Sequence, residues 1–330
     1  MAKKIVFQGK GHVELIDFET GELTADHVRL KTTCSLISTG TEGICFNRLF
    51  APGTHWDDWV KYPFATGYCT VGTVIEVGSE VSGWKIGHRA FARVVHASEH
   101  LVKPSQLFPI PDSVSDTDAM WSALSMIGSM VLHTGDIRLE DDVAIIGAGP
   151  IGQMALRWCV AAGCNTIICD PVLMRLEMAR AGGVGAVFQG SVGEFGSAIE
   201  GFFGAKPRIV IDTTGIASVF SAALPLVRNF GTLVLLGDTG DPSQQCLTPD
   251  ALRRGVRIHA CHVSHETSDW FESRIHQQFY RLLNAGRFSI DGLNTHRFLP
   301  HECVDAYSLT STKRAETMGV WFDWSKSSVP

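Results

Sequence analysis

Three glycines at positions 147, 149 and 152 place the strongest constraint on the fold of this chain. They lie in the stretch VAIIGAGPIGQMALRWCVAAGCNTIICD, residues 143–170, after a short apolar run and at the start of a helical period. In a strand–turn–helix unit, Gly147 permits the tight turn, Gly149 lets the backbone approach a pyrophosphate, and Gly152 lets helix and strand pack closely. The helix N-terminus then offers N–H groups to phosphates. The stretch therefore predicts a dinucleotide site. A glycine-rich turn without a ligand is the alternative.

Asp170 indicates which dinucleotide to expect. It ends the next apolar run, where a carboxylate can accept hydrogen bonds from both ribose hydroxyls and would repel a 2′-phosphate. We therefore predict NAD(H) rather than NADP(H). The alternative for Asp170 is a helix N-cap. Arg175 follows in an expected helix, where it either lies near the cofactor or faces solvent.

The pattern of predicted secondary structure changes near residue 118. Residues 1 to about 110 contain short alternating runs with Gly, Asp and Pro between them, which is typical of β-structure. After residue 118, apolar strands alternate with helical periods, and this predicts a parallel sheet covered on both faces. Pro225 should kink one of these helices, and residues 268–286 should form a long amphipathic helix.

Composition excludes several classes of protein. The 330 residues carry a net charge of −6 without a Lys/Arg cluster, which argues against a nucleic-acid partner. No apolar run approaches the roughly 18 residues of a membrane span, and the N-terminus has no signal-peptide core. The nine cysteines include no C-x-x-C pair. We therefore expect a cytoplasmic protein whose cysteines are mostly small buried hydrophobic residues, with a small-molecule substrate and no membrane partner.

Several segments together resemble the medium-chain dehydrogenase/reductase superfamily of alcohol-dehydrogenase-like enzymes. GTVIEVGSEVSGWKIGHRAFA (residues 72–92), GAGPIG (147–152) and IDTTG (211–215) are similar to its motifs, with His88 where the family usually has Asp. The resemblance covers nearly the whole chain. It implies an α/β fold, in which a GroES-like β-rich catalytic domain (1–118 and 290–330) accompanies a Rossmann doubly wound parallel-sheet domain (119–289). It also implies hydride transfer with a nicotinamide and a homodimer or homotetramer. The cofactor residues implied are Gly147, Gly149, Pro150, Ile151, Gly152, Asp170, Arg175, Thr214 and Gly237.

The same resemblance implies catalytic roles for residues in ISTGTE, residues 37–42. Thr39 falls where zinc-dependent members have a cysteine ligand, Thr41 where a hydroxyl relays the substrate proton, and Glu42 where a carboxylate orients the second ligand. That ligand is usually a histidine, and here Tyr68 takes its place. The family's four-cysteine structural zinc lobe is also missing. Since zinc requires about three Cys, His or carboxylate donors, we expect no zinc. A replacement site made of Cys69, Glu42 and His96 is the alternative.

Within the superfamily, ISTGTE, YPFATGY and the ending MGVWFDW resemble a zinc-lacking subgroup that contains 3-hydroxyethyl bacteriochlorophyllide dehydrogenase. The leading hypothesis is an NAD(H)-dependent enzyme that transfers a hydride between the nicotinamide and a secondary alcohol or ketone. A reductase of enones or quinones, and a dinucleotide-binding protein without catalysis, remain open. A side chain must then replace the metal in moving the proton. The candidates are Tyr68 held by Glu42, Thr41 as a relay, and Thr39 and His96 nearby.

Overall fold

The computed structural model describes residues 1–133 and 135–326. The chain divides into two compact units, one made of residues 1–123 with 293–330 and the other of residues 124–292. The second unit is therefore inserted into the first along the sequence. Among the described residues, no helix combines the length and the apolar character needed to cross a membrane.

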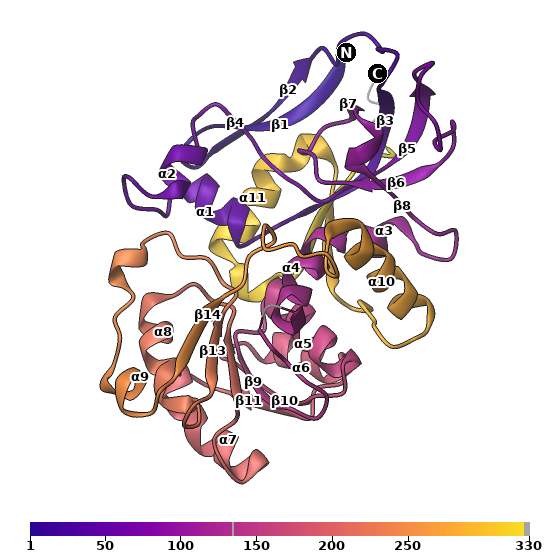
Figure 1. The fold of residues 1–330 in the computed structure, drawn as a ribbon. Helices are drawn as coiled ribbons and strands as arrows, with labels where there is room; N and C mark the ends of the chain where they lie inside the picture. Colours follow the sequence, from indigo (N-terminus) through magenta and orange to yellow (C-terminus); the bar gives the residue numbers. More distant parts are fainter. Residues whose placement is uncertain (134, 327–330) are drawn as a thin grey trace. The chain divides into compact units, whose positions relative to one another are not determined.

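The first unit is mainly β-structure (Figure 1). Its larger sheet has the order β15-β16-β3-β5-β6-β8, with β7 also paired to β3, and its smaller sheet has the order β2-β1-β4. The strands are β1 (Ala2–Gly9), β2 (His12–Phe18), β3 (Val28–Ile37), β4 (Phe64–Ala65), β5 (Thr70–Val77), β6 (Arg89–Ala92), β7 (Glu99–Val102), β8 (Leu107–Pro109), β15 (Asn294–Phe298) and β16 (Gly319–Asp323). The helices are α1 (Thr41–Asn47), α2 (His55–Trp59), α3 (Asp116–Ala119) and α11 (Cys303–Thr312).

Strand β3 is the element that positions the site of this unit. Most of its ten residues are buried, because β5, β7 and β16 all pair with it. In the antiparallel register with β16, Phe322 lies opposite Ser35 and Val320 lies opposite Ile37. The C-terminal strand therefore lies directly against the segment that leads into residues 37–42.

The second unit is a doubly wound parallel sheet, as predicted. Its six strands have the order β11-β10-β9-β12-β13-β14, and all neighbours are parallel. The strands are β9 (Asp142–Ile146), β10 (Asn165–Asp170), β11 (Ala186–Gln189), β12 (Ile209–Asp212), β13 (Thr232–Leu235) and β14 (Arg257–Ala260). The helices are α4 (Ser122–His133), which begins before the boundary of the unit, α5 (Pro150–Ala161), α6 (Leu173–Ala181), α7 (Phe195–Phe203), α8 (Ala217–Ala223), α9 (Pro249–Arg253) and α10 (Glu272–Asn284).

Two helix predictions have different outcomes in this unit. Pro225 does interrupt its helix, since α8 ends at Ala223 and a single 3₁₀ turn follows over Leu224–Leu226. The amphipathic helix starts at Glu272 rather than at Ser268, so the predicted start is wrong. The cause is local, because the hydroxyl of Thr267 accepts the N–H groups of Asp269 and Trp270 and holds them in a turn.

Gly152 marks the closest approach of α5 to the strand before it. A Cβ atom at Gly152 would lie 1.9 Å from the carbonyl oxygen of Gly147. At Gly149, a Cβ atom would meet nothing within 4 Å, and the φ of −68° is accessible to any residue. The packing of the protein therefore requires a glycine at 152, and it does not require one at 149.

This difference predicts unequal effects of two alanine substitutions on stability. Gly152→Ala should lower the free energy of unfolding by about 1–3 kcal/mol, because backbone atoms must move to admit the methyl group. Gly149→Ala should change it by less than about 1 kcal/mol, because the loss of unfolded-state entropy is offset by the poorer N-cap propensity of alanine. Urea denaturation of both variants measures the difference, and equal destabilisation by the two would contradict the packing account.

Candidate functional site

The expected cofactor residues gather at one edge of the parallel sheet. Gly147 follows β9 with a φ of +92°, and its N–H donates to the carbonyl of Cys169 at the end of β10. Helix α5 begins at Pro150 with Gly149 as N-cap and with no side chain capping it. The first N–H groups of a helix have no partner within the helix. Those of Ile151 and Gly152 therefore suit a phosphate group.

Gly149 lies where the protein leaves room for a ligand. Neither the protein's packing nor its backbone conformation accounts for a glycine there, because a Cβ atom would project into open space. A pyrophosphate lying against the backbone does account for it. The residues present therefore fit the cofactor that the sequence predicts.

Asp170 ends β10 with a carboxylate that is only 4% exposed. One of its oxygens accepts the N–H of Ala148 at 2.8 Å, and the other accepts the N–H of Val172 at 2.9 Å. The N-cap of α6 is Val172, so Asp170 does not cap this helix. Arg175 lies along α6 with its Nη1 3.8 Å from the same carboxylate, so it does not simply face solvent.

Thr214 and Gly237 meet at the end of β12. The hydroxyl of Thr214 donates to the carboxylate of Asp212 at 2.7 Å, and the N–H of Gly237 donates to the carbonyl of Asp212 at 3.0 Å. Thr213 connects this point to the glycine loop, because its hydroxyl donates to the carbonyl of Gly147 at 3.1 Å. The structure thus brings the loops after β9, β10, β12 and β13 to the same edge, where ligands bind in open α/β sheets.

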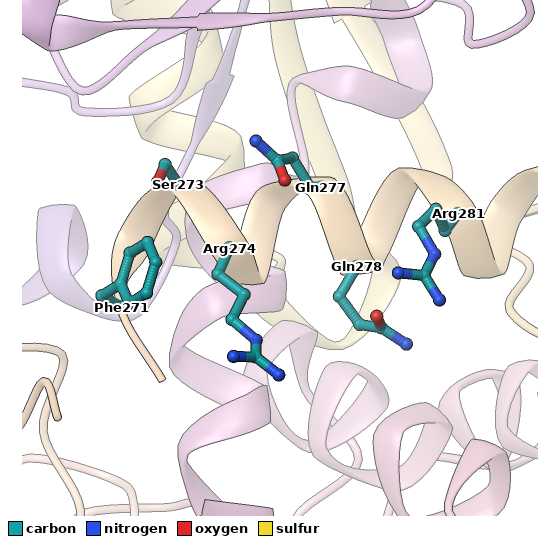
Figure 2. Close-up of a pocket in the computed structure, with 6 residues that line it drawn as sticks. All are labelled: Phe271, Ser273, Arg274, Gln277, Gln278 and Arg281. Atoms are coloured by element: carbon teal, nitrogen blue, oxygen red, sulfur yellow. The ribbon is translucent and has the colours of Figure 1, made fainter. Parts of the chain in front are cut away.

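A separate cavity of the second unit contains none of the predicted residues. It lies along α10 and the residue before it, and Figure 2 shows Arg274, Gln278 and Arg281 projecting from one side of that helix. Its lining is predominantly polar and comes from Phe271, Ser273, Arg274, Gln277, Gln278 and Arg281. Because this lining shares nothing with the glycine loop, we assign the dinucleotide site from the loop rather than from this cavity.

In the first unit, ISTGTE spans the end of a strand and the start of a helix. β3 ends at Ile37, and α1 begins at Thr41 with Gly40 as N-cap. Glu42 therefore falls in the first helical turn, where the helix dipole favours a carboxylate. Its N–H donates to the carbonyl of Ser38 at 2.8 Å, which closes this turn. Thr39 is buried, and Thr41 is partly exposed.

The Glu42 carboxylate is 1% exposed, and donors surround it. Oε1 accepts the N–H of Ser38 at 2.7 Å. Oε2 accepts the hydroxyl of Thr66 at 2.9 Å and that of Tyr307 at 2.5 Å. His96 contributes Nε2 at 3.1 Å from Oε2. Burial acts to raise the pKa of Glu42, but the charge and hydrogen bond of His96, with those of Tyr307 and Ser38, outweigh it, so that the pKa lies below its ordinary value.

His96 belongs to the interior. It is completely buried, with Nε2 at the Glu42 carboxylate and Nδ1 2.7 Å from the hydroxyl of Ser35. Trp324 donates its indole N–H to the same Ser35 oxygen at 2.9 Å. Both ring nitrogens of His96 therefore have partners inside the protein. His96 and Glu42 were predicted among the catalytic residues, and in the structure both are buried, with their polar atoms bonded inside the protein.

Tyr68, like Thr41, keeps some exposed surface. Gly67 precedes it with a φ of +100°, and a Cβ atom on Gly67 would lie 2.5 Å from the ring of His96. Only glycine fits at this position, because of the positive φ and the close approach of the His96 ring. Tyr68 therefore comes directly after a residue that packs against the buried cluster. The side chain of Tyr68 is partly exposed, in contrast to Glu42.

The phenol of Tyr68 bonds to hydroxyl groups and not to the carboxylate. Its OH donates to Ser38 Oγ at 2.5 Å and lies 3.4 Å from Thr41 Oγ1. Glu42 was predicted to hold Tyr68, and in the structure the two are linked through Ser38, which binds Glu42 through its own N–H. Burial raises the pKa of Tyr68 above its ordinary value. The nearby Cys69 and Glu42 add to that shift, and the bonds to Ser38 and Thr41 oppose it.

The residues at the expected metal position do not fit zinc. Tyr68 and Thr39 are poor ligands, and burial raises the pKa of Cys69 well above its ordinary value, which favours the neutral thiol over the thiolate that binds metals. Within residues 1–133 and 135–326, no three His, Cys, Asp or Glu side chains come together in a way that could hold a metal ion. The alternative of a site made of Cys69, Glu42 and His96 is therefore not supported.

Sequence reasoning missed four residues that complete this cluster. Ser38 stood inside the quoted stretch, and Thr66 stood two residues before Tyr68, so their positions were the only signal. Tyr307 carried no signal, and Trp324 carried only its place in the MGVWFDW ending. They join the cluster from α11 and from the residue after β16, more than 260 positions after Glu42 and Ser35.

The Glu42 cluster predicts an acid-sensitive contribution to stability. A carboxyl whose pKa is lowered on folding stabilises the protein at any pH above the pKa of the unfolded state, near 4.5. This contribution is lost as the pH falls through the pKa of the folded state. Glu42→Gln should lower the free energy of unfolding at pH 7 by about 3–5 kcal/mol, because the amide N–H groups face other donors. It should also reduce the loss of stability below pH 4.5. Urea denaturation as a function of pH, with the exposed Glu14→Gln as control, measures both effects. Identical acid profiles for Glu42→Gln and the wild type would contradict the assignment.

Comparison with known sequences gives a family and several relatives. Residues 150–277 match the family described as zinc-binding dehydrogenase. An L-threonine 3-dehydrogenase from Pectobacterium carotovorum subsp. carotovorum (strain PC1) is 29% identical over 274 residues, which cover 69% of this chain and 74% of that protein. Sorbitol dehydrogenase from Mus musculus is 26% identical over 343 residues, which cover 92% and 91%.

Solved structures share the fold over almost the full length. An Escherichia coli CFT073 protein described as a short chain alcohol dehydrogenase, complexed with NADH, has a TM-score of 0.81 at 20% identity and covers 98% of this chain and 99% of its own. A putative zinc-binding dehydrogenase from Sinorhizobium meliloti 1021, bound to NADP, has a TM-score of 0.81 at 21% identity with the same coverage. The glycine loop, the sheet order and these matches agree: the chain has the fold of these dehydrogenase structures, and its residues 150–277 are similar to the zinc-binding dehydrogenase family.

Proposed function

We propose that this protein transfers a hydride between NAD(H) and a secondary alcohol or ketone, and that it does so without catalytic zinc. The observation that carries the proposal is the Tyr68 phenol, which stands at the position of a zinc ligand and bonds to the hydroxyls of Ser38 and Thr41. The curated relatives named above are dehydrogenases of alcohols, which supports this substrate class.

NAD(H) is favoured over NADP(H) because a carboxylate ends β10. Asp170 accepts the N–H groups of Ala148 and Val172, and about two of its roughly four acceptor positions have no backbone partner. Arg175, 3.8 Å away, offsets part of its charge. A carboxylate that is already bonded to the glycine loop supports a ribose rather than a phosphate at this point.

Zinc-free chemistry requires a side chain to move the proton. Bound nicotinamide exchanges a hydride with the carbon of the substrate, and the oxygen of the substrate must gain or lose a proton at the same time. Because burial raises the pKa of Tyr68, the phenol is protonated at neutral pH and suits the acid required for ketone reduction. Thr41 is partly exposed and lies 3.4 Å from the phenol oxygen, which supports its role as a relay.

We also infer that the chain belongs to the zinc-lacking subgroup that its motifs resemble. Thr39 and Tyr68 at the ligand positions support this assignment. Trp324 adds support, because the tryptophan of the MGVWFDW ending donates to Ser35 inside the buried cluster. A cytoplasmic location is proposed as well, and the nine free cysteines support it.

The cofactor proposal predicts a measurable preference. Calorimetry should show NADH binding at least tenfold more tightly than NADPH, which corresponds to about 1.4 kcal/mol. Arg175→Gln should widen this ratio, because it removes the positive charge beside Asp170, while Asp170→Asn should narrow it. Tighter binding of NADPH by the wild type would overturn the proposal.

If Tyr68 is the acid, removing its hydroxyl oxygen should have a measurable effect on catalysis. Tyr68→Phe should lower kcat for ketone reduction by about 10²-fold or more with an unchanged affinity for NADH. Tyr62→Phe is the matched control, because its hydroxyl donates to the carbonyl of Cys45 and has no bond to the Tyr68, Ser38 and Thr41 hydroxyls among the described residues. Since the pKa of Tyr68 is raised, alcohol oxidation by the wild type should increase with pH while ketone reduction stays nearly constant near neutrality. Activity should also survive a chelator.

Two results would count against this mechanism. Stoichiometric zinc in the purified protein, with activity lost on its removal, would show that a metal performs the step. Near-full activity of Tyr68→Phe together with loss of activity in Thr41→Val would show that the proton leaves through Thr41.

A further inference from the structure

We infer that Ser38 is a positioning residue, which holds the phenol of Tyr68 while it is neutral and donates a hydrogen bond to it once it has lost its proton. This inference rests on the proposed function of Tyr68 as the acid. It adds a partner for the reacting oxygen that neither the sequence motifs nor the relatives indicate.

The first argument is that Ser38 itself is fixed in place. Its N–H donates to the Glu42 carboxylate at 2.7 Å, and its carbonyl accepts the N–H of Glu42 at 2.8 Å. Ser38 is 4% exposed, and Glu42 is in turn bonded to Thr66, His96 and Tyr307. Both backbone polar groups of Ser38 are thus tied to a residue that cannot move without breaking a buried network. Its Oγ is therefore a fixed point.

The second argument concerns which atom donates. In the structure, Tyr68 donates its only hydrogen to Ser38 Oγ at 2.5 Å. To protonate a substrate, the phenol must release Ser38 and direct that hydrogen to the substrate oxygen. Phenolate oxygen is an acceptor only, whereas a serine hydroxyl is both donor and acceptor. Rotation of the Ser38 hydroxyl hydrogen therefore converts the same contact into a bond to the phenolate, without displacement of heavy atoms.

The third argument is that the phenolate needs such a donor. The Tyr68 oxygen is near the buried negative charge of Glu42, which disfavours a second negative charge. Thr41 at 3.4 Å is too distant for a strong hydrogen bond in the present arrangement. Ser38 Oγ, at 2.5 Å, is the closer of the two hydroxyl oxygens bonded to the phenol. The proton balance is simple, since the substrate oxygen gains the proton of Tyr68 and the phenolate recovers one from solvent after product leaves.

The test compares Ser38→Ala, Ser38→Thr and Ser98→Ala. Ser98 is a matched control in the same unit, because its hydroxyl only accepts the N–H of Lys3. Ser38→Ala should lower kcat for ketone reduction at neutral pH by about tenfold and should shift the pH dependence of alcohol oxidation upward by about one pH unit. Ser38→Thr, which restores a hydroxyl, should recover both properties, and NADH affinity should not change in any variant.

A second measurement does not depend on activity. With ¹³Cζ-labelled tyrosine, the NMR resonance that is missing in Tyr68→Phe identifies Tyr68, and Ser38→Ala should move it while Ser98→Ala should not. An unmoved resonance, or a wild-type pH profile in Ser38→Ala, overturns the inference. If Tyr68→Phe is fully active, the proposed function of Tyr68 fails instead, and the resonance then reports whether Ser38 still holds the phenol.

Discussion

The buried carboxylate of Glu42 holds several separate segments of the first unit together. An ionised Glu42 is tolerated inside the protein only because four donors reach its two oxygens. Those donors come from the end of β3, from the segment before Tyr68, from the segment after β6, and from α11. Four separate parts of the chain must therefore be correctly placed to satisfy the hydrogen bonds of this one buried charge. Tyr68 is joined to this network through Ser38, so the same contacts fix the position of its phenol.

The comparison with a zinc site follows from this cluster. In a metal site, the ion is the charge that organises the ligands and lowers the pKa of a bound oxygen. Here the organising charge is negative and buried. It reaches Tyr68 through the hydrogen bonds of Ser38, and it also raises the pKa of the phenol directly as a nearby negative charge. An arrangement of this kind favours a protonated phenol. It is therefore better suited to giving a proton than to taking one, which agrees with ketone reduction.

The second unit was predictable from the sequence to a large extent, because its signals are local. A glycine spacing, an apolar run and a helical period all lie within about 30 residues, and the sheet they predict is the one observed. The start of α10 was predicted wrongly, since the hydroxyl of Thr267 competes with the helix for two N–H groups.

The first unit was less predictable, because its contacts are not local. The position of Tyr68 came from a resemblance, while its partner Ser38 and the partners of Glu42 depend on how distant segments pair. Asp170 gives an intermediate case. Its place at the end of β10 was predicted, but its bond to Ala148 and its neighbour Arg175 required coordinates.

The insertion of the second unit between the two parts of the first has a consequence for the order of folding. Tyr307 and Glu42 are 265 residues apart in sequence, and residues 124–292 lie between them. On a ribosome, β3 and Glu42 leave the exit tunnel long before α11 and β16 exist. Residues 124–292 have their own sheet and core and can fold as they emerge. The Glu42 carboxylate must stay hydrated until then, so the cluster around Glu42 is among the last parts of the molecule to exclude water.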